Sequence, residues 1–367
     1  MRLRKIVLMV VAFTIISLGI LWGILKEQAT PEPFGEPYYL DDTWPELQRG
    51  VAFGQVSGVD VDHEGNVWVL HRADRVWHGE TLSLDEISSP VVLVLKAETG
   101  EVLQQWGRNT FVMPHSLTID PQGNVWITDV GLHQVLKLDP SGTLLATFGE
   151  AGIPGDDVSH FNMPTDVAFA QDGSFFVSDG YGNHRILHFS AEGIFLNQWG
   201  EQGTAPGQFE VPHSLAVDSE GRVYVADRGN RRLQIFTETG EFLAVWENDQ
   251  LGRPWAVHVS EDGFIYVVDG GDQQEFWPDR ARILKLDMNG EIISAFGSHG
   301  SGPGQFIWPH TIAVSQEGII YVGDVRRAMG IQRFWIIAPP EPSPSSTATT
   351  GSLSHRPTRL FFASPRG

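Results

Sequence analysis

The sequence predicts an all-β protein folded as a six-bladed β-propeller. A unit of two short apolar strands, joined by a turn that contains glycine, occurs six times along the chain. Further apolar strands follow each unit and complete sets of about four antiparallel strands, spaced roughly 40 to 60 residues apart, as is typical of propeller blades. Tryptophan (12 residues) and glycine (40 residues) are abundant, which suits aromatic packing between sheets joined by tight turns. We expect the six blades within residues 50–336.

The six units follow one pattern, which sets the order of the blades. Their first strands are expected at 57–62, 115–120, 165–170, 213–218, 255–260 and 310–315. A glycine then supplies the positive φ that a tight hairpin requires, at Gly65, Gly123, Gly173, Gly221, Gly263 and Gly318. The second strands are expected at 67–70, 125–128, 175–178, 223–226, 265–268 and 320–323. An aspartate follows five of these second strands, whereas His71 stands in this place in the first unit.

The two ends of the chain differ from the repeats. Arg2, Arg4 and Lys5 precede an uncharged apolar run at 6–25, long enough to cross a bilayer. Residues 1–25 are therefore expected to be a signal anchor that holds an exported propeller on the extracytoplasmic side of the membrane. A cleaved signal peptide, which would give a secreted protein, is the alternative. Residues 26–49 are expected to form a tether and the entry to the propeller, and residues 337–367, rich in Pro, Ser and Thr, a disordered tail.

Charge and composition narrow the classes of partner and metal site. The net charge of −20 argues against a nucleic-acid partner, because binding phosphates needs clustered cations. The chain has no cysteine, which excludes disulfides, thiolate metal sites and a cysteine nucleophile. Any metal must therefore be held by His, Asp, Glu or carbonyl oxygens. We expect a monomer that acts on a small molecule or a peptide.

The first residue of each unit predicts a metal site. This position reads Ser57, His115, Thr165, His213, Trp255 and His310 around the ring. The innermost strand of a blade lines the central channel, so histidines on alternate blades lie about 120° apart and face one axis. This is the base of a tetrahedral zinc site whose fourth position is open to substrate. The alternative is that histidine merely suits a polar channel wall, but blades three and five share the repeat without having the histidine.

Two residues stand where strands end near this site. Arg72 follows the second strand of blade one, and Tyr181 follows that of blade three. An arginine near zinc suits an anionic substrate, and a tyrosine near both suits a catalytic base. Arg228 occupies the matching place on blade four. The alternative for each is an ordinary surface residue.

Several segments resemble the peptidyl-α-hydroxyglycine α-amidating lyases, which form the second catalytic half of the enzymes that amidate peptide C-termini. The matching segments are 113–120, 126–135, 164–167, 178–181 and 211–215, and the Pro-Gly-Gln-Phe connections at 206–209 and 303–306 resemble spacers between NHL repeats. The resemblance implies cleavage of a C-terminal α-hydroxyglycine into an amide and glyoxylate. It implies zinc on His115, His213 and His310, with Tyr181 and Arg72 as catalytic residues.

The resemblance also identifies departures from the family. It implies a calcium held by the backbone carbonyls of Val59 and Leu117 and by an aspartate, but this chain has Thr311 there, and a hydroxyl is a weaker calcium ligand than a carboxylate. Trp308 replaces a methionine of the family's site, so we expect Trp308, with Arg228, to contact the substrate. No monooxygenase half is present in this sequence, so the hydroxylated substrate must come from elsewhere.

Two other functions remain open at this point. One is another metal-dependent propeller enzyme, such as a hydrolase or lactonase, although those six-bladed enzymes usually hold calcium with Glu, Asn and Asp. The other is a non-catalytic, membrane-tethered NHL propeller that binds protein or glycan and needs no metal.

Overall fold

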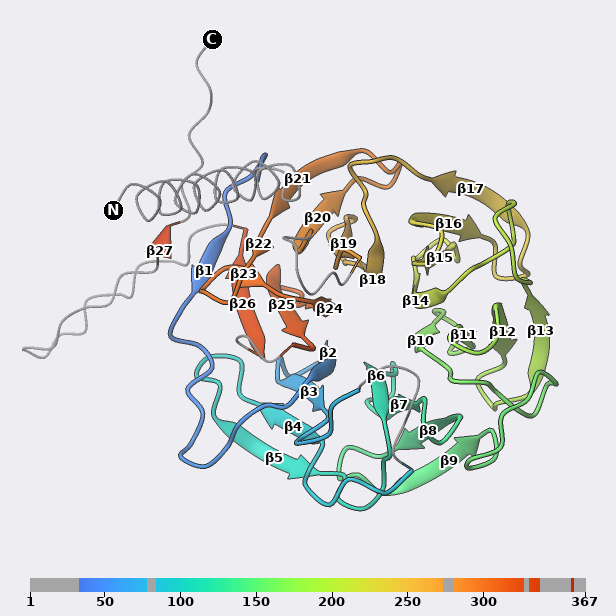
Figure 1. The fold of residues 1–367 in the computed structure, drawn as a ribbon, viewed down its shortest axis with the longest axis horizontal. Helices are drawn as coiled ribbons and strands as arrows, with labels where there is room; N and C mark the ends of the chain where they lie inside the picture. The colour runs from blue at the N-terminus through green and yellow to red at the C-terminus, as the bar shows by residue number, and fades with distance from the viewer. Residues whose placement is uncertain (1–32, 78–83, 273–279, 327–329, 337–357, 360–367) are drawn as a thin grey trace, which may run out of the picture.

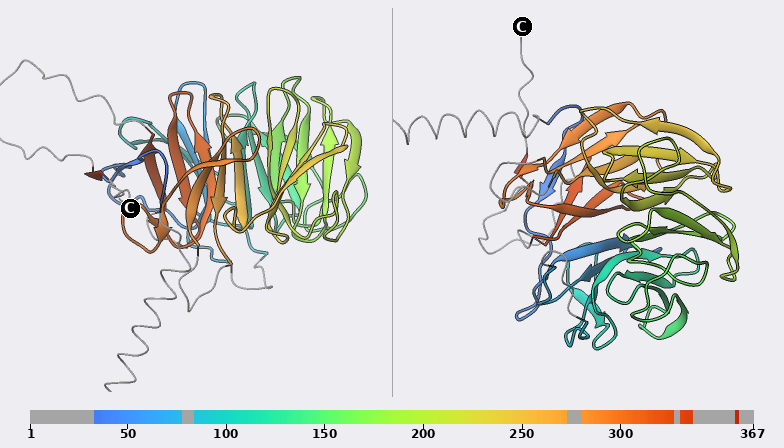
Figure 2. Two further views of the ribbon diagram at one scale, coloured as in Figure 1. Left: turned by 90° about the horizontal axis from the view of Figure 1, so that it is seen from above. Right: turned by 45° about the vertical axis from the view of Figure 1, so that its right-hand side comes forward.

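Six β-sheets stand around one central axis in the computed structural model, which describes residues 33–77, 84–272, 280–326, 330–336 and 358–359 (Figure 1). Seen from the side, the sheets form a disc (Figure 2). The prediction of an all-β six-bladed propeller is confirmed. The apolar run at 6–25 lies outside the described residues, and so does most of the predicted tail; both stay predictions. Within the described ranges, no helix is long and apolar enough to cross a membrane.

Blades one to three are each a four-stranded antiparallel sheet whose strands follow one another in chain order from the axis outward. Blade one contains β2 (Val56–Val61), β3 (Val67–His71), β4 (Val92–Leu95) and β5 (Val102–Trp106). Blade two contains β6 (Pro114–Ile119), β7 (Val125–Asp129), β8 (Gln134–Leu138) and β9 (Leu144–Phe148). Blade three contains β10 (Asp166–Phe169), β11 (Phe175–Asp179), β12 (Arg185–Phe189) and β13 (Phe195–Trp199).

Blades four and five repeat this order. Blade four contains β14 (Pro212–Val217), β15 (Val223–Asp227), β16 (Arg232–Phe236) and β17 (Phe242–Trp246). Blade five contains β18 (Pro254–Val259), β19 (Ile265–Asp269), β20 (Arg282–Leu286) and β21 (Ile292–Phe296). A short parallel pair, β22 (Ser298–His299) and β23 (Gln305–Phe306), lies in the connection to blade six.

Blade six combines the two ends of the propeller. Its inner strands are β24 (Pro309–Val314), β25 (Ile319–Asp324) and β26 (Ile331–Trp335), and its next strand is β1 (Tyr39–Asp41), which also pairs with β27 (Thr358–Arg359). Strand β1 pairs antiparallel with β26. The sequence prediction assigned 26–49 to a tether and propeller entry and 337–367 to a disordered tail. Within these stretches, β1 pairs with β26 and β27 pairs with β1, and the pairing of β1 covers the edge of β26 and closes the ring.

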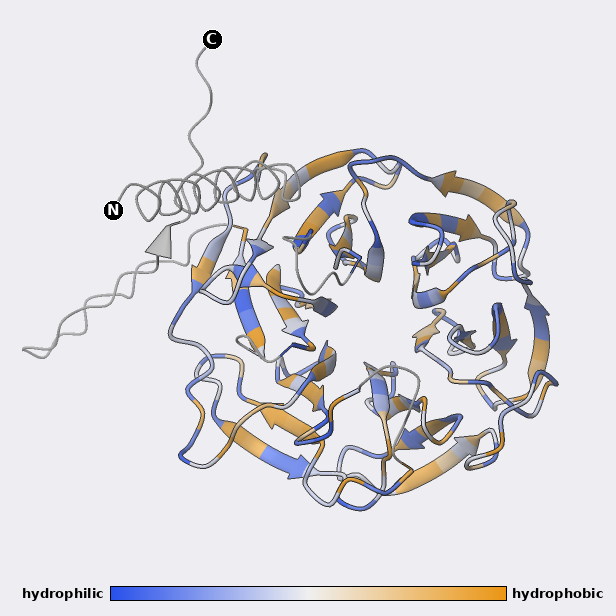
Figure 3. Cartoon of the chain, in the orientation of Figure 1, coloured by the Kyte–Doolittle hydropathy of each residue, from blue (hydrophilic) through white to orange (hydrophobic). Residues whose placement is uncertain are grey.

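Aromatic and aliphatic side chains fill the space between neighbouring blades. Apolar stretches occur in every blade (Figure 3). The second strands of blades one to five are buried along their whole length because blades pack on both of their faces, whereas an outer strand such as β9 is largely exposed. Between blades two and three, the Phe175 ring stacks on Phe189 and contacts Trp126. Each such buried aromatic contributes about 1.5–3 kcal/mol, and the resulting rigidity holds the inner strands in place.

Candidate metal centre

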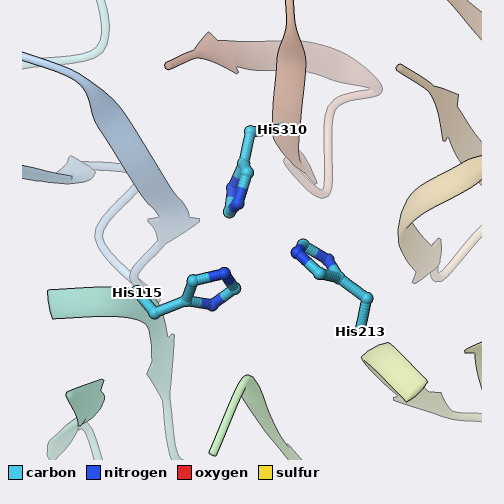
Figure 4. Close-up of side chains that lie close together, drawn as sticks. All are labelled: His115, His213 and His310. Atoms are coloured by element: carbon cyan, nitrogen blue, oxygen red, sulfur yellow. The ribbon is translucent and has the colours of Figure 1, made fainter. Parts of the chain in front are cut away.

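Three histidines meet on the propeller axis at one end of the inner strands (Figure 4). His115 lies on β6, His213 on β14 and His310 on β24, on alternate blades. All three are buried, and their potential ligand atoms lie within 4.8 Å of one another. The structure thus brings together all three residues that the repeat pattern selected, from positions almost 200 residues apart in the chain.

Hydrogen bonds to the neighbouring blades orient the three rings. Each Nδ1–H donates to the backbone carbonyl of the residue at the matching repeat position on the next blade. The pairs are His115 with Thr165 (2.7 Å), His213 with Trp255 (2.6 Å) and His310 with Ser57 (3.0 Å). Because a carbonyl only accepts, each ring carries its proton on Nδ1, and Nε2 is the atom with a lone pair. Such a carbonyl partner is what orients a histidine that binds a metal through its other nitrogen.

The hydroxyl groups of two of these partner residues hold the backbone just before the next histidine. Ser57 Oγ donates to the carbonyl of Pro114 at 3.1 Å, and Thr165 Oγ1 donates to the carbonyl of Pro212 at 2.9 Å. Trp255 has no hydroxyl, and its indole N–H donates to Gly271 instead. The side chains of Ser57 and Thr165 therefore fix the backbone directly before His115 and His213. Within the described residues, no equivalent hydroxyl hydrogen bond holds the carbonyl before His310.

The residue that ends each second strand fixes the loop leading into the first strand of the same blade. Asp129 accepts backbone N–H groups from Val112 (2.8 Å) and Met113 (3.0 Å), just before His115. Asp324 does the same for Trp308 at 3.0 Å, two residues before His310. In blade one, His71 replaces the aspartate, and its Nδ1 accepts the N–H of Gly54 at 3.1 Å. His71 thus performs the structural role of the missing aspartate.

The electrostatic surroundings keep the three histidines neutral. Burial, joined by the cationic side chain of Arg228, holds the pKa of His115, His213 and His310 well below the ordinary value of 6.5. Arg72 lowers the pKa of His115 and His310 further, and the neighbouring imidazoles lower that of His115 and His213. Only the neutral imidazole has a lone pair for a metal ion, so the site needs no deprotonation step at neutral pH.

Tyr181 lies directly against two of the histidines. Its hydroxyl is 3.1 Å from Nε2 of His115 and 2.9 Å from Nε2 of His213, and Arg228 Nη1 donates to it at 3.3 Å. The Arg228 guanidinium also lies 4.2 Å from the centre of the Trp255 ring. The predicted residues Tyr181 and Arg228 therefore share one site with the histidines.

Arg72 is almost completely buried beside the same site. Its Nε donates to the Pro114 carbonyl at 3.0 Å, and its Nη1 donates to Gln55 at 3.0 Å. Its Nη2 has no hydrogen-bond partner, and no carboxylate in the described part of the chain forms an ion pair with Arg72 or Arg228. Burial lowers the pKa of Arg72 to about 10, so the side chain stays charged at neutral pH. Two unpaired cations in a buried site are expected to bind an anion.

Two tryptophans, Trp77 and Trp255, contact residues of the site, whereas the predicted substrate contact of Trp308 stays a prediction. Trp308, predicted to contact the substrate, lies beneath the Arg326 guanidinium, 4.4 Å from its ring centre, and has no ring contact with the histidines among the described residues. Trp255 contacts His213, with ring centroids 5.2 Å apart, and Trp77 contacts Tyr181 at 5.0 Å. Sequence reasoning gave Trp77 and Trp255 no role. Trp255 could have been identified from the sequence, because it occupies the same position in its repeat unit as the three histidines do in theirs.

A cavity of about 440 Å³ runs along the axis from the histidines, between the inner strands. Val59, Leu117 and Thr311, the positions implied for calcium, all line it. The Thr311 hydroxyl oxygen accepts the backbone N–H of Val59 at 3.2 Å, which links blade six to blade one. This oxygen carries no charge and is already used as an acceptor, so the three residues do not fit a calcium site as the resemblance implies.

The comparisons with known proteins agree with this geometry. The model for "NHL repeat" matches residues 111–138, 161–189 and 209–236, which confirms NHL-type repeats in blades two to four. The chain is 40% identical over 80% of its length to peptidylglycine alpha-amidating monooxygenase of Rattus norvegicus, but spans about a third (32%) of that protein. It is 35% identical to peptidyl-alpha-hydroxyglycine alpha-amidating lyase 2 of Drosophila melanogaster, over 81% of this chain and 74% of the relative. A streptogramin B lyase structure has the same fold, with a TM-score of 0.54 at 14% identity, covering 81% of this chain and 97% of that one.

Proposed function

The chain belongs to the peptidyl-α-hydroxyglycine α-amidating lyase family, and we propose that it is a zinc-dependent lyase that splits a C-terminal α-hydroxyglycine into an amide and glyoxylate. The observation that carries the proposal is the convergence of three neutral histidines, Tyr181 and two unpaired arginines on one axial site. A purely structural metal site usually has four protein ligands, whereas three ligands leave a position for substrate. Family membership and site chemistry therefore point to the same reaction.

The three Nε2 atoms are the groups that would hold zinc. Neutral imidazoles with carbonyl partners on Nδ1 are a donor set that zinc prefers. When bound, zinc supplies a Lewis acid that stabilises negative charge on a substrate oxygen.

The remaining residues would handle the substrate itself. Arg72, through its unpaired Nη2, and Arg228 would bind the substrate carboxylate. Tyr181, as the tyrosinate, would accept the proton of the α-hydroxyl group, because its oxygen lies within hydrogen-bond distance of Nε2 of His115 and of His213. The C–N bond then breaks as the hydroxyl oxygen forms a carbonyl, and a proton passes to the departing amide nitrogen. Amide and glyoxylate together contain every atom of the substrate, so no oxidant or second substrate is required.

A product assay tests this proposal directly. The purified full-length chain, loaded with one equivalent of zinc, is expected to convert α-hydroxyhippurate to benzamide and glyoxylate in a 1:1 ratio. Both products are measured by chromatography, with the metal-free chain as the control and with simple lactones offered as alternative substrates. Lactone opening without glyoxylate release would instead support the hydrolase or lactonase function. A zinc-loaded chain that acts on neither compound would contradict the proposal.

We also propose that the axial cavity holds no calcium, because Thr311 takes the place of a carboxylate. Addition of CaCl₂ to calcium-free protein is expected to leave the melting temperature unchanged. The Thr311→Asp variant adds a carboxylate beside Val59 and Leu117, and calcium at 100-fold above its Kd would raise the melting temperature by roughly 5 °C. Thr311→Asn, which adds a side chain of the same size without the charge, is the matched control. A calcium-dependent rise in the unchanged protein would show that the cavity binds calcium after all.

A further inference from the structure

A small apolar cluster borders Tyr181 and is separate from the cores between the blades. Val112, Met113 and Val130 are buried in it. Four partly exposed side chains pack against them, namely Trp77, Leu132, Met163 and Tyr181. The cluster therefore reaches the surface at the point where Tyr181 approaches the histidines, and the side chains that form it carry no charge.

The backbone at Met163 is held in a conformation that is unfavourable for a residue with a side chain. Met163 has a φ of 62°, and His133, whose Nδ1 accepts the Met163 N–H at 3.1 Å, has a φ of 58°. The Met163 carbonyl in turn accepts the N–H of Tyr181 at 3.4 Å. Strained non-glycine residues that neighbours hold in place concentrate at ligand-binding sites. Here the strain directs a flexible apolar side chain to the border of the candidate active site.

The site thus offers a substrate cationic and apolar groups that adjoin each other, since the Arg72 guanidinium lies 5.5 Å from the centre of the Trp77 ring. Arg72 and Arg228 suit the carboxylate of the hydroxyglycine. The group on the other side of the scissile C–N bond is the acyl part of the substrate, and the apolar cluster lies within contact distance of Tyr181, which must reach that bond. Methionine adapts to apolar groups of varied shape, and Trp77 adds a flat aromatic wall.

We propose that Met163, Leu132 and Trp77 form the subsite for the side chain of the residue that precedes the hydroxyglycine. This subsite makes the enzyme selective for substrates with a large apolar or aromatic residue at that position. The inference rests on the proposed lyase function and adds the class of substrate to it. The occupant is the substrate side chain, because the cluster is continuous with the site around Tyr181.

A matched substrate pair tests the inference on the zinc-loaded full-length chain. The two substrates are N-acetyl-phenylalanyl-α-hydroxyglycine and N-acetyl-glycyl-α-hydroxyglycine, and glyoxylate release gives kcat and KM for each. We expect kcat/KM to be roughly tenfold higher for the phenylalanyl compound, mainly through KM. Met163→Gln, which keeps the length of the side chain but makes it polar, should remove most of this preference, chiefly by raising KM for the phenylalanyl compound. Met163→Leu should retain the preference.

The control variant is Leu196→Gln, an apolar-to-polar change on the exposed outer strand β13. It should change kcat/KM for neither substrate. Thermal unfolding verifies that each variant is folded. Equal kcat/KM for both substrates, or a preference that survives in folded Met163→Gln, would overturn the subsite while leaving the lyase function intact. Absence of glyoxylate from both substrates would instead refute the lyase function, and the subsite with it.

Discussion

Replacing His213 by alanine is expected to abolish stoichiometric zinc binding and to lower kcat/KM for glyoxylate release by about 10³-fold or more. The variant leaves only His115 and His310 as ligands, and two imidazoles do not retain zinc as three do. Loss of the Lewis acid removes several kcal/mol of transition-state stabilisation, and each 1.36 kcal/mol corresponds to a factor of ten. Metal content per chain, measured by mass spectrometry after gel filtration, and the glyoxylate assay report the two effects separately.

The matched control is His63→Ala. His63 is exposed and lines the other end of the axial cavity, so its loss should change neither metal content nor activity. Since His213 is buried and its Nδ1–H donates to the carbonyl of Trp255, thermal unfolding must show that His213→Ala is folded. A folded variant that still holds one zinc per chain would exclude the three-histidine site. The non-catalytic alternative predicts instead that the unchanged chain binds no metal, and that His213→Ala folds and functions normally.

Replacing Tyr181 by phenylalanine is expected to lower kcat by about 10²- to 10⁴-fold while leaving zinc content unchanged. The change removes only the hydroxyl group that lies 2.9 Å from His213 Nε2 and 3.1 Å from His115 Nε2. The ring that packs against Trp77 remains. Since the proposed role of the hydroxyl is proton transfer and not substrate binding, KM should change much less than kcat.

Tyr224→Phe provides the comparison for the loss of a tyrosine hydroxyl in the same propeller. Tyr224 is buried in blade four, and its hydroxyl donates to Asp218 at 2.9 Å. Its removal should cost about 1 kcal/mol of stability without affecting turnover. If Tyr181→Phe kept full kcat with zinc bound, Tyr181 would be a packing residue and another group would have to take the proton.

Sequence periodicity was sufficient to place the predicted zinc ligands together. The repeat of strand, glycine turn and strand is local, so it can be read from the chain and gives the number of blades. His115, His213 and His310 occupy the same position within this repeat, and in a ring of six blades that position points to the axis. Family resemblance then added roles for Tyr181 and Arg72, which periodicity alone left as possible surface residues.

Contacts between blades could not be predicted from the repeat pattern of the sequence. Closure of blade six by β1 joins residues almost 300 positions apart, and the short segment Tyr39–Asp41 carries no repeat signal. The substrate contact of Trp308 stays a prediction, and only the structure shows that the loop fixed by Asp324 places its ring beneath Arg326. Trp77 and Met163 lie outside the strands of the repeat, and the positive φ of Met163 belongs to no repeat pattern.

The amino-acid sequence by itself determined the six-bladed fold and the three histidines on its axis, because both follow from a short pattern repeated along the chain. The tertiary structure alone decided how those histidines are held. Their Nδ1 protons are fixed by carbonyls of Thr165, Trp255 and Ser57 on neighbouring blades, and the unpaired Nη2 of Arg72 results from burial beside them. These interactions arise only when separate blades pack together, and therefore no local pattern encodes them.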